Sequence, residues 1–181
     1  ANGPDRCARC KTALMDALTP IAIAESATVV LGVNLDDLGD HRPGQSKASE
    51  LGARFPLVRA GFDKAAVREW SRRLGLRTWD KPAAACLSSR IAYGTPVTLG
   101  SLRSIATAEE ALKALGFAQL RVRHHGSLAR IEVEVDALEA VLVRRSAVIE
   151  AVREAGYVYV TLDLAGFRSG SMNEVLAKGD D

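Results

Sequence analysis

The feature that most constrains the fold is a short, β-branched apolar run over residues 28–33 that stops abruptly at a polar loop. Such a run is typical of a buried strand in a parallel sheet. Asn34, Asp36 and Asp37 follow directly, at the strand end where open α/β sheets bind their ligands. Two aspartates there could hold Mg²⁺ beside a nucleotide phosphate. The alternative is an ordinary polar loop.

Helices and a second strand are predicted around this run. Apolar positions with helical spacing predict a helix over 11–26, which Pro20 is expected to break. A short strand is predicted at 55–58, and a strong helix follows over 63–75, with Asp63 as its N-cap. The alternation of helix and strand predicts an α/β fold for this half.

The second half has a different pattern. Composition changes near 93–96, so we expect one domain over residues 1–94 and a small α+β domain over 95–181. Gly126-Ser127 separates two strands and predicts a hairpin. The elements predicted in order are a helix over 99–115, strands over 119–124 and 128–135, a helix over 136–155 and a strand over 157–164.

Charge and hydropathy exclude several classes of protein. The net charge is only +2 and both signs are mixed along the chain, so no nucleic-acid partner is expected. No apolar run approaches the length of about 20 residues that a membrane span needs. No signal peptide is visible either, and a cytoplasmic location is the expectation.

The three cysteines point to metal binding or catalysis rather than to a disulfide framework, because their number is odd. Cys7 and Cys10 form a CxxC pair, and Cys86 could be a third ligand. Three thiolates would leave one position of a [4Fe–4S] cluster open for a substrate atom. Spacing alone also permits plain thiols, or a structural zinc completed by His41, His124 or His125.

Cys86 also has polar and cationic neighbours. Lys81 precedes it and Arg90 follows it, and cationic groups near a cysteine favour the nucleophilic thiolate. The alternative is a small buried apolar residue, which is the common fate of a free cysteine. Ser88 and Ser89 beside it make that alternative weaker.

Two arginines lie two residues apart in the first strand of the hairpin. Arg121 and Arg123 face the same side because strand side chains alternate, and His125 shares their phase. Two guanidinium groups on one face could bind a phosphate bidentately. The alternative is a solvated face on which Glu132 and Glu134 pair with the arginines.

A series of motifs runs in order along nearly the whole chain, and together they resemble the LarE family, the ATP-dependent sulfur transferases of nickel-pincer nucleotide cofactor synthesis. The motifs are Pro4-Asp5-Arg6-Cys7-x-x-Cys10-Lys11, Gly32-x-Asn34-x-Asp36-Asp37, Arg42-Pro43-Gly44, Phe55-Pro56-Leu57, Lys64, Trp79-Asp80-Lys81-Pro82, Ala85-Cys86-Leu87-x-Ser89-Arg90, Arg121-Val122-Arg123, Ala129-Arg130-Ile131-Glu132-Val133 and Leu162-Asp163-Leu164-x-Gly166-x-Arg168-Ser169-Gly170-Ser171.

The resemblance implies the remainder of an adenine-nucleotide α-hydrolase-like (PP-loop, Rossmann-like) parallel sheet, followed by a small α+β domain, in a homo-oligomer. It also implies that ATP and Mg²⁺ activate a carboxylate of pyridinium-3,5-biscarboxylic acid mononucleotide before sulfur is inserted. In family members with one motif cysteine, that cysteine gives up its sulfur and becomes dehydroalanine. Members with three cysteines resemble thiolases whose [4Fe–4S] cluster holds an added sulfide.

Carried over position by position, the resemblance implies roles for individual residues. Cys86 is the catalytic sulfur carrier or a cluster ligand with Cys7 and Cys10. Glu109 matches an acidic position near subunit contacts. The remaining positions are assigned to substrate and phosphate binding (Lys11, Ser89, Arg90, Arg121, Arg123) and to nucleotide and Mg²⁺ binding (Asn34, Asp36, Asp37).

One departure from the family pattern concerns ATP. The family's N-terminal strand and its Ser-Gly-Gly-x-Asp-Ser pyrophosphate loop are not found in these 181 residues. Backbone amides in such a loop cradle the pyrophosphate. We therefore expect the loop to come from a longer form of the protein or from another chain. The alternatives to a sulfur transferase of this family are a tRNA-thiolating PP-loop enzyme and a non-catalytic metal-binding fragment.

Overall fold

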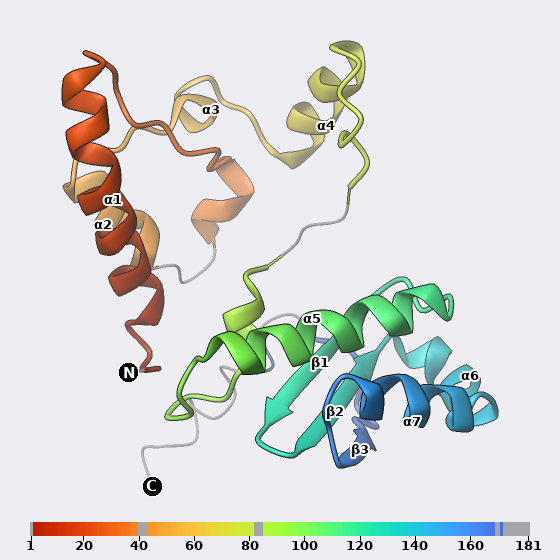
Figure 1. The fold of residues 1–181 in the computed structure, drawn as a ribbon. Coiled ribbons are helices and arrows are strands. Elements are labelled where there is room, and N and C mark those ends of the chain that lie inside the picture. Colours follow the sequence, from red (N-terminus) through yellow and green to blue (C-terminus); the bar gives the residue numbers. More distant parts are fainter. Residues whose placement is uncertain (1, 40–42, 82–84, 169–170, 172–181) are drawn as a thin grey trace, which may run out of the picture. The chain divides into compact units, whose positions relative to one another are not determined.

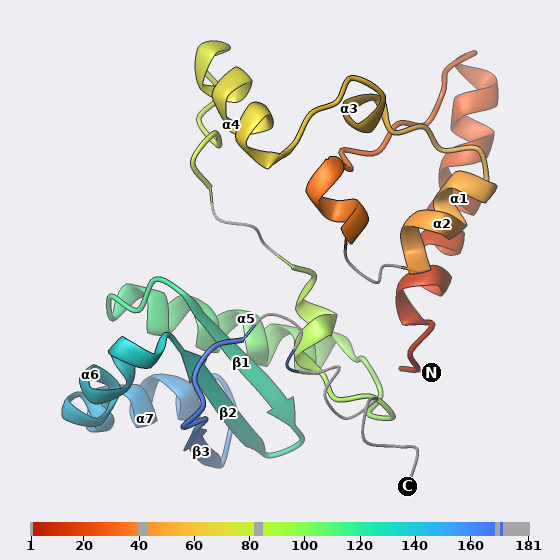
Figure 2. The same ribbon diagram turned by 180° about the vertical axis from the view of Figure 1, so that it is seen from behind.

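The computed structural model describes residues 2–39, 43–81, 85–168 and 171. The chain divides into two compact units (Figures 1 and 2): an N-terminal unit of residues 3–84, and a C-terminal unit of residues 1–2 and 85–181. The sequence placed the domain boundary after residue 94. Residues 85–94 lie in the C-terminal unit because Arg90 and Ile91 are buried against its helix and sheet.

The C-terminal unit contains a three-stranded mixed sheet. The strands β1 (Leu120–His125) and β2 (Leu128–Val133) are antiparallel, and β3 (Tyr159–Leu162) runs parallel to β2. Gly126 has a φ of +64° in the tight turn between β1 and β2, so the predicted hairpin is confirmed. A positive φ at this turn suits glycine, which has no Cβ.

Helices cover one face of this sheet. Figure 1 shows α5 (Leu99–Ala114) and α7 (Arg145–Glu154) on the same side of the strands, and α6 (Leu138–Val143) precedes α7 in the chain. Thr98 and Ser101 form a reciprocal capping box that starts α5. Alternate strand residues such as Val122 and Ile131 pack under these helices and form the main core. Short 3₁₀ turns lie at Leu87–Arg90 and Val135–Ala137.

The single helix predicted over 136–155 is wrong, because the structure breaks it at Arg144. The backbone of Arg144 leaves the helical region, with φ −98° and ψ 20°. Its guanidinium donates to the Leu115 carbonyl and lies 5.7 Å from the centre of the Phe117 ring. These tertiary contacts favour the break, and nothing in the local sequence signals them.

The N-terminal unit is mostly helical. It contains α1 (Arg6–Ala24), a 3₁₀ turn (Leu35–Gly39), α2 (Pro43–Glu50), α3 (Pro56–Arg59) and α4 (Lys64–Arg73). In both views α1 and α2 lie side by side. A small core of Met15, Ala48 and Ala53 lies between them and the segment that follows. The predicted N-cap is confirmed, since Asp63 accepts a hydrogen bond from the Ala66 amide at 2.7 Å.

Three details predicted for this unit are wrong. The first helix begins at Arg6 rather than residue 11 and continues through Pro20 to Ala24. Within the described residues, the run over 28–33 pairs at only one parallel bridge, Val30 with Arg54. The stretch predicted as a strand at 55–58 is the helix α3, because Pro56 at its first position has the backbone angle of a helix start.

None of the helices in the described part of the chain is both long enough and apolar enough to cross a membrane.

Candidate active site

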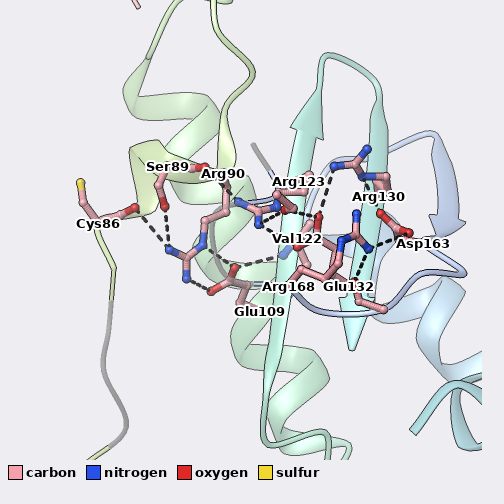
Figure 3. Close-up of polar contacts among 12 residues, drawn as sticks. Cys86, Ser89, Arg90, Glu109, Val122, Arg123, Arg130, Glu132, Asp163 and Arg168 are labelled. Atoms are coloured by element: carbon pink, nitrogen blue, oxygen red, sulfur yellow. Dashed lines mark hydrogen bonds and ion pairs between the residues drawn. The ribbon is translucent and has the colours of Figure 1, made fainter. Parts of the chain in front are cut away.

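A buried ion pair lies at the centre of the C-terminal unit (Figure 3). Arg90 Nε and Nη2 donate to Glu109 Oε1 and Oε2 at 2.8 and 3.0 Å. Both side chains are at most 5% exposed. Glu109 Oε1 also accepts from the Val122 backbone amide at 3.0 Å, so one carboxylate ties the turn before Ile91 to strand β1. Glu109, predicted near subunit contacts, is therefore enclosed within its own unit.

The same arginine fixes the backbone around Cys86. Arg90 Nη1 donates to the carbonyls of Ala85 at 2.9 Å and Cys86 at 3.3 Å, and to Ser89 Oγ at 3.1 Å. The Cys86 side chain itself is exposed and forms no disulfide. In Figure 3 its sulfur points away from the Arg90 guanidinium. Arg90 thus holds the main chain of Cys86 rather than its thiol.

A hydroxyl lies beside the sulfur. Cys86 Sγ and Ser88 Oγ are 3.1 Å apart, and either atom can donate. The prediction that Cys86 lies in a polar setting rather than an apolar core agrees with this exposed position. The arrangement presents a thiol to solvent from a backbone that Arg90 holds by hydrogen bonds, which suits a group that must reach a bound substrate.

Arg123, predicted to bind phosphate, is 4% exposed and already engaged. Its Nη1 donates to the Ser89 carbonyl at 3.0 Å, and its Nη2 donates to Glu132 Oε2 and Ser171 Oγ, both at 2.7 Å. Ser171 Oγ in turn donates to Glu132 Oε1 at 3.1 Å. Glu132 therefore pairs with an arginine, as the alternative interpretation predicted, but the pair is buried rather than on a solvated face; Glu134 is exposed.

Arg121 lies on the same face of β1 but in a different environment. Its guanidinium is 5.1 Å from the centre of the Phe167 ring, and it makes no ion pair with any residue that the structure describes. Partial burial, and then the nearby positive charge of Arg90, lower the pKa of Arg121. A half-buried arginine without a carboxylate partner is well suited to bind an anion.

Arg130, which the sequence places on the strand next to Arg121 and Arg123, lies beside this face together with Asp163 and Arg168, whose part in it was not predicted. Arg130 Nη2 donates to Glu132 Oε1 at 3.2 Å, and Arg130 Nε lies 3.6 Å from Asp163 Oδ2. Arg168 Nη1 lies 3.8 Å from the other oxygen of Asp163. Asp163, Arg168 and Ser171 belong to one of the motifs that carry the family resemblance, and that motif was the available signal.

In the N-terminal unit, the predicted nucleotide residues form a compact turn. Asn34 and Asp37 exchange hydrogen bonds between backbone amides and side-chain oxygens, at 3.1 and 3.3 Å. Asp36 Oδ2 accepts from the Lys64 amide at the start of α4, at 2.8 Å. Carboxylate and amide oxygens gathered at this turn suit Mg²⁺, which proteins hold by one or two carboxylates together with substrate phosphates.

The CxxC pair lies at the start of α1, on a side that α2 approaches closely. Cys7 and Cys10 are both exposed and neither forms a disulfide. An added Cβ on Gly44 of α2 would lie 2.7 Å from the Cys7 carbonyl oxygen and 3.0 Å from Lys11 Cγ. Glycine at this position therefore allows the close approach of α2 to the cysteine turn.

The predicted site residues fall into two sets. The N-terminal unit contains Lys11, the CxxC pair and the turn over 34–37. The C-terminal unit contains the others, namely Cys86, Ser89, Arg90, Glu109, Arg121 and Arg123. The ligand set Cys7, Cys10 and Cys86 draws on both units and stays a prediction.

Among the described residues no group of three or more His, Cys, Asp or Glu side chains could hold a metal ion. Two of the alternative zinc ligands are described: His124 Nδ1 is 3.1 Å from the Tyr157 hydroxyl, and His125 is exposed. His41, Arg42 and Ser169-Gly170 lie outside the described residues.

Comparison with known proteins gives three relatives, while no family model matches the chain. An uncharacterized protein of Synechocystis is 44% identical over 181 residues, covering 98% of this chain and 68% of the relative. The pyridinium-3,5-bisthiocarboxylic acid mononucleotide synthase of Lactiplantibacillus plantarum is 40% identical over 178 residues, covering 98% and 64%. An uncharacterized protein of Methanocaldococcus jannaschii is 28% identical over 169 residues, covering 93% and 66%. The chain thus spans about two thirds of the length of these relatives.

Proposed function

Since this chain belongs to the LarE family, we propose that it acts in the ATP-dependent conversion of pyridinium-3,5-biscarboxylic acid mononucleotide carboxylates into thiocarboxylates. The observation that carries the proposal is the 40% identity, over 98% of the chain, to a protein named as the synthase of the bisthiocarboxylic acid mononucleotide. The position of Cys86 supports it, because an exposed thiol stands on a backbone held by a buried ion pair.

The proposed chemistry has three steps. A substrate carboxylate attacks the α-phosphorus of ATP, which gives an acyl adenylate and releases pyrophosphate. The Cys86 thiolate then attacks the carbonyl carbon, and AMP leaves with the C–O electron pair. Loss of the Cys86 Cα proton and cleavage of its Cβ–S bond leave sulfur on the substrate, as a thiocarboxylate, and dehydroalanine in the protein.

The predicted site residues of the two units have separate tasks in this proposal. Arg90 orients the main chain of residues 85–89 through its hydrogen bonds to two carbonyls and a hydroxyl. Arg121 supplies the positive charge for the phosphate of the mononucleotide, since it has no carboxylate partner among the described residues. Arg123 holds the Ser89 carbonyl and thereby supports the same turn. Asn34, Asp36 and Asp37 would hold Mg²⁺, which would in turn bind the phosphates of ATP.

The three cysteines also fit a [4Fe–4S] cluster in their chemistry, because all are exposed thiols that no disulfide removes. Cys7, Cys10 and Cys86 would be its ligands. When bound, the cluster would carry an added sulfide at its open iron, so that Cys86 would keep its own sulfur. The two routes therefore differ in the fate of Cys86.

The test combines product analysis with the mass of the intact protein. The protein, in its longest natural form, is incubated anaerobically with the mononucleotide, ATP and Mg²⁺, and thiocarboxylate is measured by mass spectrometry. We expect product from the unmodified protein and none from Cys86→Ala, with the circular dichroism spectrum unchanged. Product formation by Cys86→Ala contradicts the proposed role.

The sulfur source is read in the same experiment. Loss of one H₂S from the protein mass indicates the sacrificial route through Cys86. An unchanged mass, with bound iron and acid-labile sulfide that Cys7→Ser abolishes, indicates the cluster route.

A further inference from the structure

The helix α4 and the turn after it carry a surface that the proposed function does not use. We define the Trp–Arg surface as Trp70, Arg72, Arg73, Leu74, Arg77 and Trp79, all in the N-terminal unit. All six residues are exposed. The tryptophans are the only two in the chain.

Arginine–tryptophan contacts join the helix and the turn into one surface. The Arg73 guanidinium lies 5.3 Å from the centre of the Trp70 ring, and the Arg72 guanidinium lies 5.8 Å from that of Trp79. Glu69 pairs with both arginines, at 3.2 and 2.8 Å. These contacts orient the guanidinium groups before any partner binds, which lowers the entropy cost of binding.

The apolar part of this surface is exposed. Trp70 is 48% exposed, Leu74 is 70% exposed and Trp79 is 40% exposed. Contiguous exposed apolar groups with a polar rim are typical of interaction sites. Tryptophan and arginine are also the residues most enriched at the energetic centres of protein interfaces.

The charge of the surface is positive. Its three arginines carry +3, and the adjoining Glu69, which pairs with Arg72 and Arg73, carries −1. A partner that matches this surface must therefore be acidic. Nucleic acids are acidic and stack on tryptophan, but they have no aliphatic groups to cover Leu74. An acidic protein segment with aliphatic side chains complements both features.

We propose that the Trp–Arg surface is a docking site for an acidic protein segment that carries aliphatic side chains. Its carboxylates meet Arg72, Arg73 and Arg77, and its aliphatic side chains pack on Trp70 and Leu74. The proposal does not depend on the sulfur-transfer activity.

Within these 181 residues tryptophan fluorescence reports on this surface, because both tryptophans belong to it. The probe is a synthetic helical peptide with leucines along one face and glutamates beside them. We expect a saturable shift in emission that weakens with added salt. A matched peptide with glutamine in place of glutamate should bind at least about fivefold more weakly. Absence of a saturable shift with the acidic peptide overturns the proposal.

Two charge reversals locate the site on the protein. Arg77→Glu lies in the surface and should weaken binding of the acidic peptide by about fivefold. Arg59→Glu is the matched control, since Arg59 is an exposed arginine of α3 in the same unit and outside the surface. Equal weakening by both variants overturns the proposal. Tighter binding of a single-stranded oligouridine or of anionic lipid vesicles than of the acidic peptide also overturns it.

Discussion

Arg90 and Glu109, which are 19 residues apart in the sequence, form an ion pair with two hydrogen bonds inside the C-terminal unit. Arginine is suited to this geometry because its planar guanidinium matches a carboxylate at two points. The pair joins the turn after Cys86 to α5 and, through the Val122 amide, to β1. Loss of either partner would leave a charge buried and unmatched.

Glu109→Gln should destabilise the C-terminal unit by about 3 kcal/mol, because the positive charge of Arg90 would lose its counter-ion in a buried site. The free energy of unfolding, measured with urea by circular dichroism, checks this. Glu110→Gln is the matched control, since Glu110 is exposed on the same helix and should change stability by less than about 0.5 kcal/mol. Equal effects of the two variants would show that the buried pair does not stabilise the fold.

Gly166→Ala should destabilise the same unit by about 1 to 3 kcal/mol. Gly166 has a φ of +70°, and an added Cβ would lie 2.8 Å from Val135 Cγ2 and 3.0 Å from the Val133 carbonyl oxygen. Gly100→Ala, within α5, meets no such contact and should stabilise by up to about 1 kcal/mol through helix propensity. Urea unfolding measures the change in the free energy of unfolding of each variant. Destabilisation by Gly100→Ala would contradict the expected difference between the two glycines.

Gly44→Ala should disturb the packing of α2 on the turn that carries Cys7. The clash involves a backbone oxygen, which cannot rotate away, so we expect a loss of about 1 to 3 kcal/mol. Gly32→Ala is the control, because a Cβ added at Gly32 would meet nothing within 4 Å. Limited proteolysis and urea unfolding of the N-terminal unit should show the difference. An undisturbed Gly44→Ala variant would mean that α2 does not approach Cys7 this closely.

Stability of the C-terminal unit should depend on pH through His124. Burial lowers the pKa of His124 below its ordinary value of 6.5, so the folded state favours the neutral imidazole. The unfolded chain then binds more protons below pH 6.5, and this contribution to stability is lost as the pH falls from 6.5 through the lowered pKa. It is fully present above pH 6.5.

Urea midpoints between about pH 5 and pH 8 measure this dependence. His124→Gln, which does not titrate, should show a smaller decrease on acidification than the unmodified protein. If the urea midpoint falls equally with decreasing pH in both proteins, the pH dependence does not come from His124. The neighbouring Tyr157, whose pKa burial raises to about 12, stays protonated over this whole range.

The sequence predicted the C-terminal unit better than the N-terminal one, for a physical reason. Local signals predict the hairpin, because strand alternation and the Gly126 turn agree. The break at Arg144 depends on contacts with Leu115 and Phe117, which no local pattern reveals. In the N-terminal unit, the run over 28–33 forms a single bridge among the described residues. A strand needs a neighbouring strand to pair with, and the run's own residues do not reveal whether one is present.

The sequence predicted on which face of the hairpin Arg121 and Arg123 lie, but not what surrounds each of them. The pattern of β1 correctly placed Arg121 and Arg123 on one face. It could not show that Arg123 is enclosed by Glu132 and Ser171 while Arg121 packs on Phe167, because those partners come from distant parts of the chain.

The bridge between Ile91 and His124 has a consequence for solubility. As an outer strand of the sheet, β1 would otherwise present open amides and carbonyls along its free edge, a template for pairing with a strand of another molecule. Ile91 and the carboxylate of Glu109 occupy part of that edge. Any change that detaches the turn after Cys86 would expose this edge of β1. We therefore expect molecules with a detached turn to be the ones that aggregate.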